Sequence, residues 1–170
     1  QSQGSYDLVS AEIIAINPSN WNQTITINQG KNVGLRRNMA VIAPQGIVGR
    51  INEIRAHTAE VILLNDPREG NFIGGMVART RTMVLVIGGG YYRGQCTVKP
   101  AIDSYFIDLK KNDLILTAEN SDIFPRGMPI GRITSIDKGT QQMVNQASLK
   151  PTVKLGRLQM VYVLKSQRVQ

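Results

Sequence analysis

One histidine, one cysteine and nine serines are the side chains of this 170-residue sequence from which a histidine-activated nucleophile could be built. A serine hydrolase needs a serine hydroxyl beside a histidine base, a carboxylate that orients the base, and backbone donors for the oxyanion. His57, Asp66 and Ser104 are one trio that can be written down. However, no serine lies in a glycine-rich turn that would present it, and His57 falls in a polar turn at residues 55–58. We therefore predict no enzyme, with an inactive or cryptic trypsin-like protease as the enzymatic alternative.

Metal and nucleotide sites lack their usual ligands as well. One histidine and one cysteine cannot supply the three or four protein ligands of a zinc site, and the acidic residues are scattered. Cys96 lies in a strand-like stretch and is expected to be a small buried side chain rather than a thiolate. The glycines at residues 88–90 are not followed by the lysine and hydroxyl residue of a phosphate-binding loop. We expect no catalytic residue, no metal and no cofactor.

The same glycine run predicts a flexible hairpin whose tip carries Tyr91, Tyr92 and Arg93. Tyrosine and arginine are the residue types that most often anchor protein interfaces. The alternative is that both tyrosines pack back over the mouth of a barrel. We take these three residues and Phe124 as the candidate partner-binding residues.

The net charge of +8 points to an anionic partner or to a well-solvated surface. The 33 residues after Asp137 hold six lysines and arginines and no acidic residue. Barrels that bind single-stranded nucleic acid stack bases on aromatic side chains, but Tyr162 is the one aromatic residue in that stretch. A basic nucleic-acid-binding module is therefore an alternative function that the sequence does not favour.

No stretch of the sequence is suited to cross a membrane as a helix. The longest uncharged stretch, residues 13–30, contains Pro18 and nine asparagine, glutamine, serine or threonine residues. Residues 1–10 are expected to be a linker or the truncated end of a longer protein.

Short apolar runs that end in turn-forming residues predict an all-β protein. About twelve strands are expected, which suits a β-sandwich or barrel architecture. The predicted strands are residues 8–16, 24–27, 39–43, 47–54, 60–64, 72–77, 83–87, 95–99, 114–117, 128–136, 141–147 and 158–164.

Two segments recur in the same order, which predicts a duplicated barrel. Residues 48–54 align with residues 130–136, and residues 35–42 align with residues 109–116. A period near 80 residues is too long for a solenoid and fits two related barrels of about six strands each. In both copies a glycine, Gly49 or Gly131, interrupts a β-branched strand, as it does where a strand bends or another backbone approaches closely.

Short motifs also follow one another along residues 11–164 in the order known from one protein family. They are Ala11-Glu12-Ile13-Ile14, Asn17-Pro18-Ser19-Asn20-Trp21, Ile25-Thr26-Ile27-Asn28-Gln29-Gly30, Gly34, Met39-Ala40-Val41-Ile42, Gly46-Ile47-Val48-Gly49-Arg50-Ile51, Val61-Ile62-Leu63-Leu64-Asn65-Asp66-Pro67, the stretch from Ile123-Phe124-Pro125-Arg126-Gly127 to Ile133, Pro151 and Val161-Tyr162-Val163-Leu164. In this order they resemble the rod shape-determining protein MreC family. The expected structural residues in these motifs are Gly30, Gly34, Gly46, Gly49, Pro125, Gly127 and Gly131.

The resemblance implies two barrels with the topology of trypsin-like proteases but no catalytic site. The first would span residues 11–74, completed by a C-terminal strand at 151–164, and the second would span residues 75–150. The resemblance also implies a non-enzymatic scaffold of cell-wall elongation on the extracytoplasmic, periplasmic side of the cell membrane. Its expected partners are a class B penicillin-binding protein, MreD, the MreB complex and further copies of itself in an oligomer or filament. Contact with the membrane would run through a transmembrane segment missing from this chain.

Overall fold

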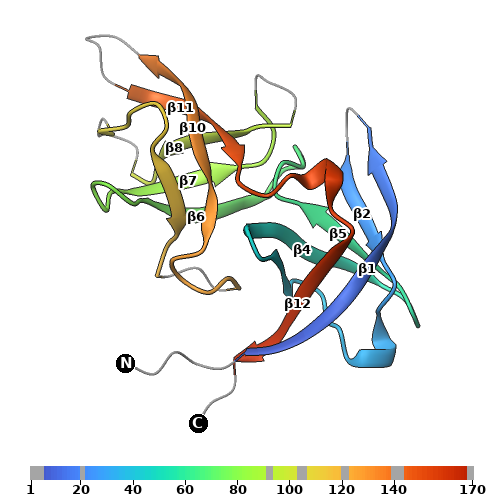
Figure 1. Cartoon of the computed structure of the whole chain (residues 1–170). Coiled ribbons are helices and arrows are strands. Elements are labelled where there is room, and N and C mark those ends of the chain that lie inside the picture. The colour runs from blue at the N-terminus through green and yellow to red at the C-terminus, as the bar shows by residue number, and fades with distance from the viewer. Residues whose placement is uncertain are drawn as a thin grey trace. The chain divides into compact units, whose positions relative to one another are not determined.

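The computed structural model describes residues 6–19, 22–90, 94–102, 107–119, 123–138 and 144–167, almost all of them in strands and tight turns (Figure 1). No helix within these residues is long and apolar enough to cross a membrane. The elements are β1 (Tyr6–Pro18), β2 (Gln23–Ile27), η1 (Lys31–Val33), β3 (Ala40–Ala43), β4 (Gly46–Ile54), β5 (Ala59–Leu63), β6 (Phe72–Val77), β7 (Met83–Ile87), β8 (Cys96–Pro100), β9 (Leu114–Thr117), β10 (Pro129–Lys138), β11 (Val144–Pro151), η3 (Leu155–Arg157) and β12 (Met160–Gln167).

These strands close into two six-stranded barrels. The first barrel has the order β1-β12-β3-β4-β5-β2, and the second has the order β10-β11-β8-β7-β6-β9. Inward-facing isoleucine and valine side chains fill each barrel, as the alternation of side chains along a strand requires. The predicted all-β fold with two six-stranded barrels is confirmed.

The two barrels share one pairing scheme. Strands β1 to β5 of the first barrel correspond to β7 to β11 of the second, in the same order, and β12 corresponds to β6. Under this correspondence, each pair of neighbouring strands in the first barrel matches a pair of neighbours in the second. For example, β1 pairs with β2 and β12, and β7 pairs with β8 and β6. The structure thus agrees with the duplication that the two recurring sequence segments predict.

The recurring segments also adopt the same backbone conformation. Asn38 and Asn112 both lie in the left-handed region, with φ of 68° and 73°. Their N–H groups donate to the carbonyl oxygens of Ile51 and Ile133, each at 2.8 Å. In the return direction, Ile51 N–H donates to the Met39 carbonyl at 3.0 Å, and Ile133 N–H donates to the Asp113 carbonyl at 2.9 Å. Each pair of bonds ties the turn before β3 or β9 to the following strand.

Gly49 and Gly131 permit a close approach of neighbouring strands. A Cβ atom on Gly49 would overlap the carbonyl oxygen of Ile62, and a Cβ atom on Gly131 would overlap that of Lys150. The clash involves backbone, which cannot move aside without opening the barrel. Both positions therefore require glycine for the same reason.

The other residues expected to be structural serve in turns. A Cβ atom on Gly30 would overlap the backbone carbonyl of Arg55, while Gly34, Gly46 and Gly127 have φ of 77°, 146° and 77°. The carbonyl oxygen of Pro125 accepts a hydrogen bond from the hydroxyl of Thr117.

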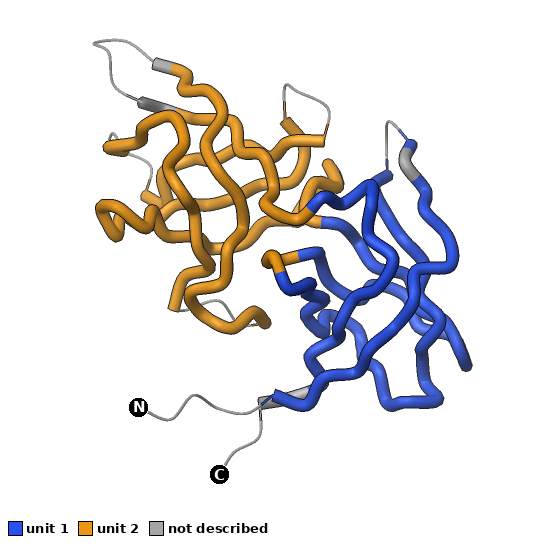
Figure 2. Tube along the Cα trace, viewed as in Figure 1, with its two compact units in different colours: residues 1–44, 48–63, 154–170 blue, residues 45–47, 64–153 orange. Residues whose placement is uncertain are grey.

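The chain divides into two compact units (Figure 2). Unit 1 comprises Gln1–Pro44, Val48–Leu63 and Lys154–Gln170, and unit 2 comprises Gln45–Ile47 and Leu64–Val153. β12, from the end of the chain, lies between β1 and β3 in the first barrel. The expected boundary between residues 74 and 75 falls inside β6, a strand of the second barrel, so the chain leaves the first barrel after β5.

Candidate partner surfaces

The predicted hairpin tip, Tyr91, Tyr92 and Arg93, lies outside the described residues. The turn that leads to it is firmly held within unit 2. Gly88 N–H donates to the Asn71 carbonyl at 2.9 Å, and Gly89 N–H donates to the Asn65 carbonyl at 3.1 Å. The first two of the three glycines thus belong to a packed turn rather than to a flexible one.

Phe124 is buried, with 6% of its surface exposed. The sequence analysis names it as a candidate partner contact. In the folded protein its ring is part of the apolar interior of unit 2, so it has little surface to offer a partner. Phe124 therefore has a packing role in this conformation.

Two of the residues considered for chemistry, Asp66 and Cys96, are buried and hydrogen-bonded within the fold. Asp66 is fully buried, and its two carboxylate oxygens accept bonds of 2.8 and 3.1 Å from Arg68. His57 is exposed, and Ser104 lies outside the described residues. The Cys96 thiol donates to the Leu64 carbonyl at 3.6 Å, and burial raises its pKa to about 12, so it stays a protonated thiol at neutral pH. No group of three or more metal-ligating side chains occurs among the described residues.

The outer surface of the second barrel has an apolar half, which we call the apolar face. Three neighbouring strands, β9, β6 and β7, contribute only apolar residues at their outward positions. Phe72 is 56% exposed and Met83 is 39% exposed, and the other members are partly exposed. The apolar face consists of Phe72, Gly74, Met76, Met83, Leu85, Ile87, Leu114 and Leu116.

Cross-strand pairing arranges these residues in rows. Met76 lies opposite both Met83 on β7 and Leu116 on β9, and Phe72 lies opposite Ile87. The remaining strands of the same barrel carry polar residues at their outward positions, among them Thr97, Lys99, Arg132, Gln146, Ser148 and Lys150. A contiguous apolar area on an otherwise polar surface is typical of a protein interaction site, and methionine and aromatic residues are enriched in such sites.

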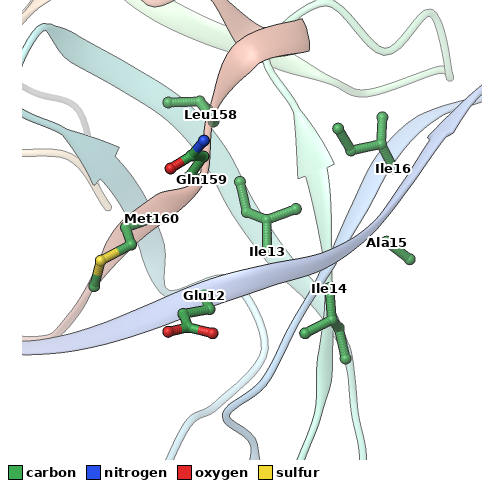
Figure 3. Close-up of a pocket in the computed structure, with 8 residues that line it drawn as sticks. All are labelled: Glu12, Ile13, Ile14, Ala15, Ile16, Leu158, Gln159 and Met160. Carbon is green, nitrogen blue, oxygen red and sulfur yellow. The ribbon is translucent and has the colours of Figure 1, made fainter.

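The first barrel carries a groove along β1. Its volume is about 610 Å³, and its lining residues are 12–16 and 158–160. Figure 3 shows Ile13 projecting to one side of β1 and Glu12 and Ile14 to the other, with Leu158 on the neighbouring segment. Among the described residues, five of the eight exposed large apolar side chains belong to β1 and β12: Tyr6, Leu8, Ile14, Ile16 and Met160. The exposed apolar residues of unit 1 are thus concentrated on one strand pair.

Sequence reasoning missed both surfaces. The signal for the apolar face was present, because residues 72–77 and 83–87 are apolar at odd and even positions alike. Such a run is usual for a strand that is covered on both faces, whereas a strand at a solvated surface alternates. The groove had no comparable signal, because it arises where two strands separate.

The family model described as "Rod shape-determining protein MreC, barrel core" matches residues 13–165 of the chain. A cell shape-determining protein MreC from Listeria monocytogenes is 29% identical over 160 residues, which cover 94% of this chain and 54% of that protein. The chain thus spans about half the length of this relative.

Solved structures show the same fold. The crystal structure of MreC from Pseudomonas aeruginosa matches with a TM-score of 0.82 and 25% identity, covering 93% of this chain and 99% of that one. A complex between a penicillin-binding protein, PBP2, and MreC from Helicobacter pylori contains a chain that matches with a TM-score of 0.68 and 16% identity, covering 95% of this chain and 100% of that one.

Proposed function

Since this chain belongs to the MreC family of rod shape-determining proteins, we propose that it is a non-enzymatic scaffold of the cell-wall elongation machinery. Its barrels would bind and organise a class B penicillin-binding protein, together with MreD and the MreB complex. They would work on the extracytoplasmic side of the membrane, held there by a membrane anchor. A scaffold of this kind raises the effective concentration of one partner near another, and it needs binding surfaces rather than catalytic groups.

The observation that carries this proposal is the apolar face of the second barrel. Phe72 and Met83 are the most exposed of its members and lie on adjacent strands. Burying an exposed apolar side chain contributes about 25 cal/mol per Å² of surface removed from water. A rigid sheet also loses little conformational entropy on binding, so less of that free energy is offset by ordering of the surface. The Helicobacter pylori structure adds support for the partner class, since it is a complex between an MreC of the same fold and a penicillin-binding protein.

Binding to the soluble extracytoplasmic part of the elongation transpeptidase tests the proposal. We expect saturable binding that survives high salt, because apolar contacts are not screened by ions. The double variant Phe72→Ser with Met83→Ser should weaken it at least about thirtyfold, as expected for two anchors of about 1 kcal/mol or more each. Its melting temperature should stay close to that of the unchanged protein, because both side chains point away from the barrel interior.

The matched control is the double variant Gln146→Ser with Ser148→Ala on the polar outward positions of the same barrel. It should bind the transpeptidase as the unchanged protein does. Equal affinity for all three proteins would contradict the assignment of the apolar face. Binding that disappears at high salt would show that the +8 net charge, rather than an apolar surface, accounts for the interaction.

The tip at Tyr91, Tyr92 and Arg93 stays a proposal for a second contact, since it follows β7 along the chain. Alanine at all three positions should weaken binding while the melting temperature is unchanged. Affinity equal to that of the unchanged protein would remove the tip from the interface. Self-association into an oligomer or filament is likewise part of the proposal, and sedimentation at increasing protein concentration measures it.

A further inference from the structure

β1 changes its hydrogen-bonding partner halfway along its length. Its residues from Tyr6 to Glu12 pair with β12, and those from Ile13 to Pro18 pair with β2. The last bond on the β12 side runs from Ile13 N–H to the Gln159 carbonyl, at 2.9 Å. Beyond it, no strand among the described residues pairs with this side of β1. Backbone N–H and C=O groups point alternately to the two sides of a strand. Some of those in residues 14–18 therefore point to this side of β1, where a further strand could bond to them.

The groove of about 610 Å³ lies along this open side (Figure 3). Ile14 is 55% exposed, and Ile16 and Met160 are each about half exposed. A free strand edge supplies the hydrogen bonds for an added strand, and flanking apolar side chains supply contacts for its alternate residues. The groove therefore offers both requirements of strand addition in one place.

The charge around the groove defines which strand would fit. Unit 1 contains nine lysines and arginines and four acidic residues, a net charge of 9 − 4 = +5. Lys154 and Arg157 are exposed and lie four residues and one residue before the segment 158–160 that lines the groove. Glu12 is the single acidic residue in the lining. A second copy of the chain would bring another +8 against this surface, whereas an acidic segment is attracted to it.

We propose that residues 14–18 of β1 accept an extended, acidic segment of a partner protein as an added β-strand. Its apolar side chains contact Ile14, Ile16 and Met160, and its carboxylates reach Lys154 and Arg157. This site is on the first barrel, and it does not depend on the proposed binding of a penicillin-binding protein to the second.

A synthetic ten-residue peptide of alternating valine and glutamate tests the site. Titrated into the ¹⁵N-labelled protein, it should shift the backbone amides of residues 13–17 and 158–160, with saturation. The same peptide with N-methyl groups on alternate backbone nitrogens keeps its charge and side chains but cannot complete the ladder. It should bind at least about tenfold more weakly, the loss expected when two or more hydrogen bonds are removed.

Charge-reversal variants test the acidic character. Lys154→Glu with Arg157→Glu should weaken binding of the peptide by at least about fivefold, the change in affinity that corresponds to one exposed ion pair of about 1 kcal/mol. Lys31→Glu with Arg36→Glu is the control, because it makes the same change in net charge at two exposed positions away from the groove. Equal losses in both variants would show a long-range charge effect and overturn the site.

Three other outcomes would also overturn the proposal. The first is no amide shift in β1 at saturating peptide, and the second is equal binding of the N-methylated peptide. The third is a shift of the same amides on raising the protein concentration without peptide, which would make a second copy of the chain the occupant.

Discussion

The two barrels have the same interior construction and different exteriors. Both have the same order of strand pairing. Each also has an asparagine in the left-handed region before β3 or β9, and a glycine where the carbonyl of a neighbouring strand approaches closely. On the outside, the first barrel concentrates its exposed apolar side chains on β1 and β12, beside an open strand edge. The second barrel displays a three-strand apolar face.

This difference shows which positions the duplicated fold constrains. Inward residues and close-approach glycines are needed to close each barrel, so both copies retain them. Outward residues are free of that requirement, so the copies can present different surfaces. Two copies of one stable frame with unlike exteriors suit the scaffold function proposed above.

The largest expected effect comes from the equivalent glycines. Gly49→Val and Gly131→Val should each destabilise the protein by at least about 3 kcal/mol, because the added side chain meets backbone that cannot yield. Thermal unfolding measures this loss. Gly156→Ala, at a position where the added Cβ meets open space rather than another part of the fold, should leave the melting temperature nearly unchanged. If only one of the two valine variants is destabilised, the glycines are not structurally equivalent.

Two buried leucines, one in each recurring segment, allow the stability of the two barrels to be tested separately. Leu35 and Leu109 are both buried, so alanine at either should cost about 2–5 kcal/mol through lost contacts and a cavity. Hydrogen exchange should show faster exchange in β3 and β4 for Leu35→Ala, and in β9 and β10 for Leu109→Ala. Loss of protection in both barrels from either variant would mean that the two barrels unfold as one unit.

A smaller effect is expected at the left-handed asparagines. Alanine at Asn38 or Asn112 should cost about 1 kcal/mol relative to glycine at the same position, because an L side chain is strained there. Denaturant unfolding of the alanine and glycine variants gives this difference directly. A difference near zero in either barrel would mean that its turn relaxes out of the left-handed region.

The smallest effect concerns an ion cluster at the end of β6. Arg79 donates to Asp113 at 2.9 and 3.0 Å and to Asp108 at 3.2 Å, and these bonds lower the pKa of both carboxyl groups. The resulting stabilisation is present above the ordinary aspartate pKa of about 3.9 and is lost as the pH falls through the lowered values. Titration followed by NMR should show both pKa values rising towards the ordinary value in Arg79→Gln.

Arg126→Gln is the control for this titration, because Arg126 pairs with Glu119 and not with either aspartate. The pKa values of Asp108 and Asp113 should not change in it. An equal change in both variants would assign the effect to net charge rather than to the hydrogen bonds of Arg79.

Most of the fold could be predicted because its signals are local. Runs such as residues 24–27 alternate, and Gly49 and Gly131 sit in matching contexts, so the strands and the duplication followed from the sequence. Strand ends were less certain: β1 extends two residues beyond each end of its predicted range, because pairing with β12 and β2 continues there. The extension at Tyr6 depends on β12, more than 100 residues away, whereas Asn17 and Pro18 pair with the adjacent strand β2. A local pattern does not contain the distant partner.

The candidate site was harder to predict. Phe124 is a candidate partner contact in the sequence, and only the surrounding structure shows that it is buried. The apolar face required knowledge that β9, β6 and β7 are neighbours, although β9 is separated from β7 by β8 in the sequence. Exposure is a property of the assembled barrel, and so residue types alone could not distinguish an outward methionine from an inward one.

The position of β12 has a consequence for how the chain folds during synthesis. All six strands of the second barrel lie between Phe72 and Pro151, so this barrel can close as soon as that stretch has emerged. The first barrel begins earlier but waits for β12, which is made after every strand of the second barrel. Until then the edges of β1 and β3 that β12 covers stay open, a period in which unpaired strands are prone to misassembly. The half that starts first is therefore the half that finishes last.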